Sequence, residues 1–136
     1  VISNVGDSRA YHITPLTITR VTRDHSLVES MVERGDITAE EARRHPNRNL
    51  ITRALGPDAQ IQCDGYICPM EPGEFLLLCS DGLVDTVTDE EMQRTVTGAR
   101  TGEECLARLL EISKSRGAKD NVTAVLMRRT DGKEAV

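Results

Sequence analysis

The feature of this sequence that most limits its fold is one uninterrupted apolar run, FLLLC at residues 75–79, which ends directly at the tripeptide SDG (residues 80–82). An apolar run without alternation is typical of a strand that is covered on both faces. A second strand pattern, NVTAVLM at residues 121–127, begins directly after Asp120. We therefore expect a sheet that contains both strands, with acidic residues at the strand ends.

The other elements follow from local patterns. VISNV, RAYHI and LTITR predict three short strands, so that residues 1–20 form a β meander with a corner at GDS (residues 6–8). Residues 59–68 predict a strand that is broken at Gly65. A Ser or Thr followed three residues later by Glu predicts the start of a helix. That pattern occurs at Ser26/Glu29, Thr38/Glu41, Thr88/Glu91 and Thr101/Glu104.

Glycine and proline predict where these helices end. The first stops at Gly35, the second before Pro46, and the last and longest runs to about Ser115 and ends at Gly117. The result is a mixed pattern of helices and strands.

Length and composition exclude several classes of protein. The chain has 136 residues, which suits one domain, and a formal net charge of -5 argues against binding to a nucleic-acid backbone. It has two Tyr, one Phe and no Trp, too few for a base-stacking surface. No apolar run approaches the ~20 residues of a membrane span. No signal peptide is visible, and because the chain starts at Val1 within a strand pattern, we expect the true N-terminus to lie elsewhere.

None of the four cysteines forms a C-x-x-C pair, so a zinc knuckle is not indicated. A disulfide framework is not expected, because the chain has enough apolar residues to fold without one. Cys79 ends the apolar run and Cys105 lies on a helix face. Both are expected to be small buried hydrophobic residues.

Three aspartates lie where strands begin or end. If the strands around Asp81 and Asp120 are antiparallel, both carboxylates meet at one edge of the sheet, and Asp7 in the GDS corner can reach that edge. Neighbouring carboxylates repel one another unless they are protonated or bridged by a cation, and Mg²⁺ and Mn²⁺ prefer such oxygen ligands. An aspartate before a glycine is also a common turn pair, so the residues alone leave both readings open.

Five segments in this order resemble the second half of bacterial PP2C-type (PPM family) metal-dependent protein serine/threonine phosphatases: VGDSRAY, TRDHSLVESMVERGDIT, HPNRNLITRALG, LLLCSDGL and DNVTAVL. The resemblance runs from Ile2 to about Met127. It implies an α+β fold, a PP2C-like β-sandwich flanked by helices in α-β-β-α layers, with only its C-terminal part in residues 1–129 and a tail at residues 130–136. It also implies that residues 24–56 form a flap segment beside the active site that influences substrate choice.

The resemblance further implies a site and a reaction. Asp81 and Asp120 match ligands of a binuclear Mn²⁺ or Mg²⁺ centre, and Asp7 with Asp81 matches a third metal site. The expected reaction is hydrolysis of phosphoserine and phosphothreonine in proteins by water that two or three ions activate, with no catalytic residue beyond the metal ligands. The expected partner is a phosphoprotein, the target of a kinase, in the cytoplasm. Neither nucleic acid nor a membrane is expected to bind this segment.

Patterns of the family's first half do not occur here: the arginine that grips phosphate, an acidic residue in N-E/Q-D, and the bridging aspartate of D-G-x-G-G. We therefore expect the chain to be a fragment that needs the missing N-terminal half of the same domain, and to be inactive by itself. Two functions remain open for the whole protein. It is an active phosphatase, or it is a non-catalytic PP2C-like partner-binding domain or a regulatory phosphatase of an anti-sigma-type pathway. His25 is either an acid or a substrate contact, or it caps or braces the flap helix.

Overall fold

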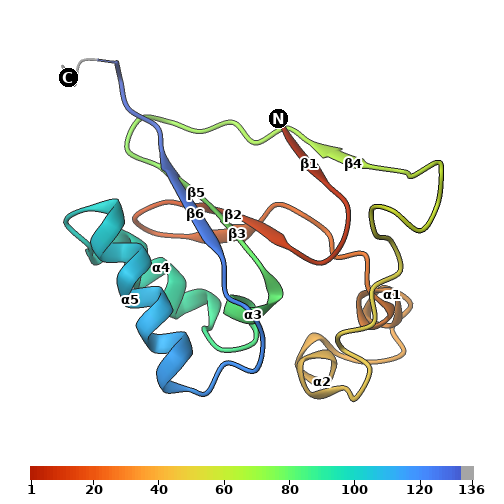
Figure 1. The fold of residues 1–136 in the computed structure, drawn as a ribbon. Coiled ribbons are helices and arrows are strands. Elements are labelled where there is room, and N and C mark those ends of the chain that lie inside the picture. The colour runs from red at the N-terminus through yellow and green to blue at the C-terminus, as the bar shows by residue number, and fades with distance from the viewer. Residues whose placement is uncertain (133–136) are drawn as a thin grey trace.

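The computed structural model of the protein describes residues 1–132, so residues 133–136 of the predicted tail lie outside the described residues. Figure 1 shows the fold as a ribbon. The elements in chain order are β1 (Ile2–Asn4), β2 (Arg9–Ile13), β3 (Ile18–Arg20), α1 (Leu27–Glu33), α2 (Ala39–Arg44), β4 (Asp64–Tyr66), β5 (Phe75–Cys79), α3 (Asp81–Val84), α4 (Asp89–Gly98), α5 (Gly102–Ser115) and β6 (Ala124–Arg128).

The main sheet has four antiparallel strands in the order β3-β2-β5-β6. Strands β5 and β6 are antiparallel neighbours, which meets the condition that the sequence left open, and Cys79 at the end of β5 lies opposite Ala124 at the start of β6. The polypeptide after β5 and the polypeptide before β6 therefore meet at one edge of the sheet. This edge is where Asp81 and Asp120 lie in the sequence.

The predicted meander of residues 1–20 is wrong in its first strand. Strand β1 does not pair with β2 but forms a separate two-stranded sheet with β4, in which Ser3 lies opposite Gly65. The predicted strand at residues 59–68 is also shorter than expected, because only Asp64–Tyr66 is extended and Gly65 lies inside it rather than breaking it. Pairing with β1 provides hydrogen bonds that the local sequence pattern does not reveal.

The predicted helix starts are confirmed. Thr38 and Thr88 form complete capping boxes with Glu41 and Glu91. Ser26 and Thr101 accept a hydrogen bond from the backbone three residues on, but the return bond of the box is not made. The short helix α3 directly after Ser80 was not predicted, because its four residues are too few to show a helical period.

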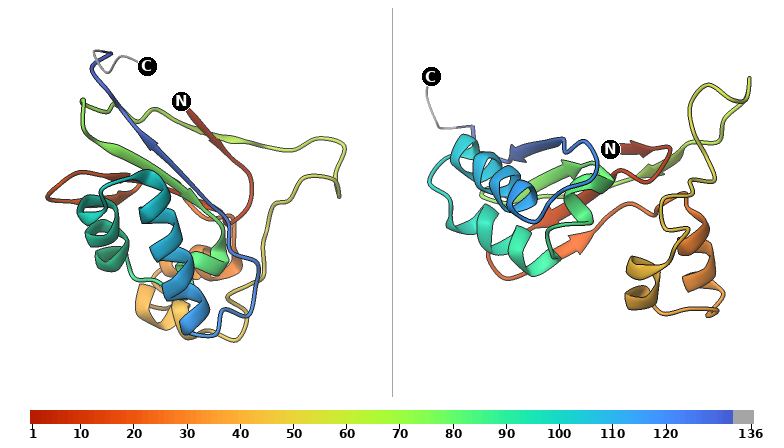
Figure 2. Two further views of the ribbon diagram at one scale, coloured as in Figure 1. Left: turned by 60° about the vertical axis from the view of Figure 1, so that its left-hand side comes forward. Right: turned by 60° about the horizontal axis from the view of Figure 1, so that its bottom comes forward.

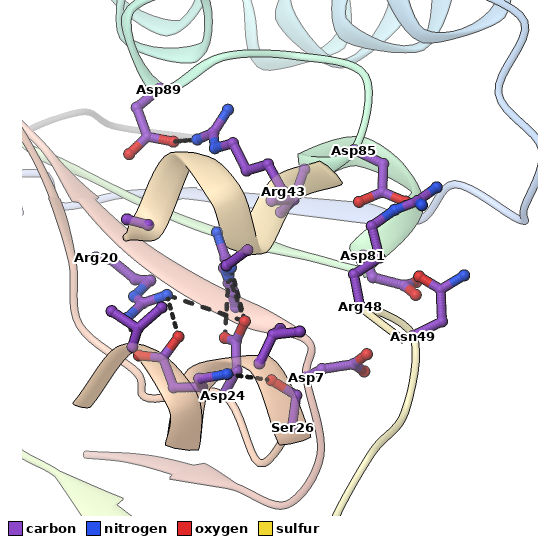
Figure 3. A pocket seen from close by; sticks show the side chains of 17 residues that line it. Asp7, Arg20, Asp24, Ser26, Arg43, Arg48, Asn49, Asp81, Asp85 and Asp89 are labelled. Atoms are coloured by element: carbon purple, nitrogen blue, oxygen red, sulfur yellow. Dashed lines mark hydrogen bonds and ion pairs between the residues drawn. The ribbon is translucent and has the colours of Figure 1, made fainter. Parts of the chain in front are cut away.

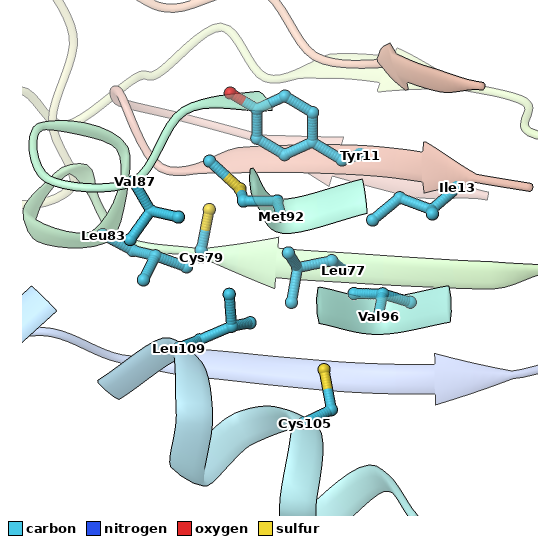
Figure 4. Packing of buried hydrophobic residues seen from close by; sticks show 10 residues of the cluster. All are labelled: Tyr11, Ile13, Leu77, Cys79, Leu83, Val87, Met92, Val96, Cys105 and Leu109. Atoms are coloured by element: carbon cyan, nitrogen blue, oxygen red, sulfur yellow. The ribbon is translucent and has the colours of Figure 1, made fainter. Parts of the chain in front are cut away.

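Helices α4 and α5 cover one face of the main sheet, and α1 and α2 lie apart from them beyond the sheet edge (Figure 2). Side chains from β2, β5, α3, α4 and α5 interdigitate between the sheet and the helices (Figure 4). The buried cluster comprises Tyr11, Ile13, Leu77, Cys79, Leu83, Val87, Met92, Val96, Cys105 and Leu109. Cys79 and Cys105 are free and buried in this cluster, as predicted, and Cys63 and Cys68 are free as well.

The opposite face of the sheet is less well covered. Leu76 is buried there and Leu78 is half-buried, but Val125 and Met127 on the neighbouring strand are 49% and 45% exposed. The prediction that the FLLLC strand is covered on both faces thus holds only in part. Among residues 1–132, no helix combines the length and the apolar character needed to cross a bilayer.

Candidate functional site

The site begins at Ser80, which joins the end of β5 to the start of β6. Its N–H donates to the Thr123 carbonyl and its hydroxyl accepts from the Thr123 N–H, both over 3.0 Å. The same hydroxyl donates to the carbonyl of Asn121 over 3.2 Å. These bonds hold the segment before β6 beside the residue that precedes Asp81. Ser80 therefore has a positional role that the sequence pattern did not reveal.

Gly82 allows the two segments to approach closely. A Cβ atom built at Gly82 would lie 2.4 Å from the carbonyl oxygen of Asn121 and 3.3 Å from a methyl group of Val122. Only a residue without a side chain fits between α3 and the polypeptide that enters β6. The SDG tripeptide thus brings Asp81 near Asp120.

The three predicted metal ligands influence one another electrostatically. Burial raises the pKa of Asp81, and the nearby negative charge of Asp120 raises it further. Burial also raises the pKa of Asp7, with the charge of Asp81 as the second cause. Asp81 therefore links the other two electrostatically: Asp7 feels the charge of Asp81, and Asp81 feels the charge of Asp120.

The carboxylates are only partly engaged by the protein itself. One oxygen of Asp81 accepts from the Gly82 N–H over 2.9 Å, and one oxygen of Asp120 accepts from the Asn121 N–H over 2.6 Å. Among the ion pairs of residues 1–132, none involves Asp7, Asp81 or Asp120.

These residues fit part of a metal site rather than a complete one. Carboxylates outside ion pairs, two of which have a pKa raised by a neighbouring aspartate, are a donor set that a hard divalent cation would stabilise. However, within the described part of the chain, no three His, Cys, Asp or Glu side chains lie close enough together to hold a metal ion. Asp81 forms one pair with Asp7 and another with Asp120, and each pair would need further ligands.

A pocket of about 390 Å³ lies between this edge of the sheet and the flap segment (Figure 3). Asp7 and Asp81 line it on one side, and Arg43, Arg48 and Asn49 of the flap segment line the other. Asp120 is not part of its lining. The pocket therefore has an acidic wall that belongs to the candidate metal site. The flap segment contributes Arg43 and Arg48 to the pocket, together with the acidic Asp24 and Glu29.

Two further aspartates on the acidic wall were missed by the sequence reasoning. Asp85 follows Asp81 by one helical turn, raises the pKa of Asp81, and lies with Oδ2 3.7 Å from Nε of Arg48. Asp89 lies 3.6 Å from Arg43. The i, i+4 spacing of Asp81 and Asp85 is the signal that could have revealed the first of these, but only if α3 had been predicted.

The flap segment is attached to the sheet by buried polar contacts at its start. Arg9 donates from Nε and Nη2 to the Asp24 carboxylate at distances of 2.7–3.0 Å. The neighbouring His25 is buried, with Nδ1 and Nε2 both hydrogen-bonded inside the protein. Since neither ring nitrogen faces the pocket, the reading of His25 as an acid or substrate contact is wrong. Ser26, not His25, caps α1.

The sequence and the fold of this chain match known proteins over almost its whole length. A serine/threonine phosphatase stp of Listeria monocytogenes is 38% identical over 129 residues, which are 95% of this chain and 51% of that protein. The structure of serine/threonine phosphatase Stp1 from Staphylococcus aureus has a TM-score of 0.84 and 40% identity, covering 93% of this chain and 50% of the other. No family model matches the chain.

A helix-flanked antiparallel sheet and this similarity in sequence and fold define the class: the chain is a homologue of PP2C-type (PPM) serine/threonine phosphatases. Within that class it has the α+β fold of the bacterial phosphatases and spans about half the length of the curated relatives it matches. The catalytic domain of the phosphatase PstP, 34% identical with a TM-score of 0.79 over 95% of this chain, was solved in complex with two manganese ions.

Proposed function

We propose that the protein containing this chain hydrolyses phosphoserine and phosphothreonine in proteins and requires Mn²⁺ or Mg²⁺. The observation that supports this most directly is the placement of Asp7 and Asp81 in one pocket, with Asp120 brought near Asp81 by the antiparallel pairing of β5 and β6. The similarity to named serine/threonine phosphatases supports the substrate class.

The residues of this chain would hold the ions and orient the substrate. Asp81 and Asp120 would share one ion, and Asp7 with Asp81 would contact another. Bound ions of this kind supply an activated water and neutralise the phosphoryl charge during in-line displacement. Ser80 and Gly82 would set the separation of the carboxylates. Cys79 has no role as a nucleophile, because burial raises the pKa of its thiol to about 12.

The flap segment would contribute to the choice of substrate. Arg43 and Arg48 line the pocket opposite the acidic wall, where a phosphopeptide could accept hydrogen bonds from a guanidinium group. We propose a cytoplasmic kinase target as the substrate. The chain lacks about half the length of its relatives, and we expect the 136-residue chain alone to be inactive.

The test is a phosphopeptide assay on the complete protein that contains this chain, with Mn²⁺ and with a chelator. We expect chelation to abolish turnover and Asp81→Asn to lower it by more than about 100-fold, since a lost ligand costs more than a lost outer contact. Asp58→Asn, at an exposed position away from the pocket, is the matched control and should leave turnover unchanged.

Turnover that survives chelation would contradict the proposal. A complete protein that binds Mn²⁺ but hydrolyses no phosphopeptide would instead favour a non-catalytic, partner-binding domain.

A further inference from the structure

The corner of the chain that precedes Asp7 is held by one residue of the flap segment, His25. The Gly6 N–H donates to Nδ1 of His25 over 3.1 Å, and the His25 N–H donates to the Gly6 carbonyl over 2.8 Å. Gly6 has a φ of 116°, which residues with a side chain rarely adopt. Because the N–H and the carbonyl of Gly6 both bond to His25, this residue determines the direction in which the chain enters Asp7.

The second ring nitrogen of His25, Nε2, is also held by a hydrogen bond. A neutral imidazole carries one proton, and since Nδ1 accepts from Gly6, the proton lies on Nε2. Nε2 donates to Oδ2 of Asp64 over 2.9 Å, and Nη1 of Arg53 donates to Oδ1 of the same carboxylate over 2.9 Å. These bonds hold the pKa of Asp64 below its ordinary value, with the His25 bond as the first cause. The carboxylate therefore orients the ring, and the ring orients the Gly6 corner.

The backbone of His25 also connects the corner to the far end of the flap segment. Its carbonyl accepts from the Thr52 N–H over 2.7 Å, and Ser26 pairs with Ile51 in an isolated bridge. Asp64 itself belongs to β4, opposite Asn4, whose amide Nδ2 donates to the Gly6 carbonyl over 3.3 Å. Gly6, the residue before Asp7, thus bonds to Asn4 and His25, and His25 in turn bonds to Thr52 and Asp64.

We infer that His25 is a positioning residue for Asp7, which holds the Gly6 corner so that the Asp7 carboxylate faces Asp81. The inference rests on the proposed function, because it takes Asp7 and Asp81 as carboxylates of one metal site. The ring acts through Gly6 and takes no part in proton transfer to a substrate.

Two conservative substitutions separate this role from a general contribution to stability. Asn places its Oδ1 near the position of Nδ1, so His25→Asn keeps an acceptor for the Gly6 N–H and loses the bond to Asp64. Gln places its Nε2 near the position of the histidine Nε2, so His25→Gln keeps a donor for Asp64 and loses the bond to Gly6. His25→Gln removes a buried hydrogen bond and His25→Asn a partly buried one, so the stability of both variants is measured by thermal unfolding beside the titration.

The experiment is a calorimetric titration of the complete protein with Mn²⁺ alone. The Asp7→Asn variant is titrated beside the wild type, and the class of bound ions that it weakens is the class that depends on Asp7. We expect His25→Gln to weaken the binding of that class by about 10- to 100-fold, the range for lost outer contacts of metal ligands. His25→Asn keeps the bond to Gly6, so it should weaken the binding of that class of ions by less than about threefold. A change of that size corresponds to less than about 1 kcal/mol. His12→Gln is the control: His12 also contacts a carboxylate through Nε2, that of Glu74 at 2.8 Å, but lies toward the far end of β2.

Equal Mn²⁺ affinities in His25→Asn and His25→Gln would overturn the inference, because they would show that the bond to Gly6 does not matter for Asp7. A wild-type protein that binds no Mn²⁺ would overturn the proposed metal site and this inference with it. The two failures are distinguishable, since only the second one affects the wild type.

Discussion

Replacing Gly82 by alanine tests whether the approach of α3 to β6 positions the candidate site. The added Cβ would lie 2.4 Å from the carbonyl oxygen of Asn121, about 1 Å short of ordinary contact. The obstacle is backbone that Ser80 holds in place, so no side-chain rotation relieves it. Overpacking of this kind costs about 1–3 kcal/mol. Alanine within a helix recovers about 0.5–1 kcal/mol, so we expect a net loss of about 1–2 kcal/mol.

The same substitution should affect the site more than the fold. Relief of the contact moves the start of α3 away from the segment that carries Asp120, and with it Asp81. A displacement of about 1 Å in catalytic groups typically costs about 100-fold in rate. We expect a loss of that size in phosphopeptide hydrolysis by the complete protein, together with weaker Mn²⁺ binding in a calorimetric titration.

Gly98→Ala is the matched control, because no atom lies within 4 Å of a Cβ built there at the end of α4. We expect it to leave Mn²⁺ binding unchanged and stability equal or slightly higher in urea unfolding. A Gly82→Ala protein with wild-type stability and wild-type Mn²⁺ binding would refute the reasoning that close approach at Gly82 sets the geometry of the site.

Two further predictions concern ion pairs. Hydrogen bonds from Arg116 hold the pKa of Glu91 down at about 2. Because this lies below the ordinary value of 4.5, the stabilisation is complete above pH 4.5 and is lost as the pH falls toward 2. Glu91→Gln should therefore flatten the loss of stability between these pH values in acid-unfolding curves. Asp24→Asn leaves the partly buried Arg9 without its carboxylate, and we expect it to cost about 2–3 kcal/mol in urea unfolding.

The Asp24→Asn prediction has a matched control in another ion pair. Glu33→Gln removes an exposed ion pair with Arg23 and should change stability by less than about 1 kcal/mol at neutral pH. An Asp24→Asn variant no less stable than Glu33→Gln would show that the Arg9 pair contributes little. An acid-unfolding curve of Glu91→Gln parallel to the wild-type curve would contradict the assignment of a low pKa to Glu91.

The sequence alone predicted the features that depend on local chemistry. Thr38 and Thr88 begin helices because their side chains and those of the following glutamates satisfy the first backbone N–H groups, and these bonds span three residues. The apolar run at residues 75–79 forms a strand, and its antiparallel pairing with residues 124–128 brings Asp81 near Asp120. The positions of Asp81 and Asp120 at strand ends were visible in the sequence, whereas the antiparallel pairing that brings them to one edge was only a condition until the structure supplied it.

Only the tertiary structure decided which distant segments pair and how the site is supported. Strand β1 pairs with β4, more than 60 residues away, instead of with β2, because hydrogen bonds between strands depend on packing that no local pattern encodes. The same holds for His25, whose two ring nitrogens contact residues 19 positions before it and 39 after it. The aspartates are recognisable from their positions at strand ends. Their orientation depends on Ser80, Gly82 and His25, since these contacts join parts of the chain that meet only after folding.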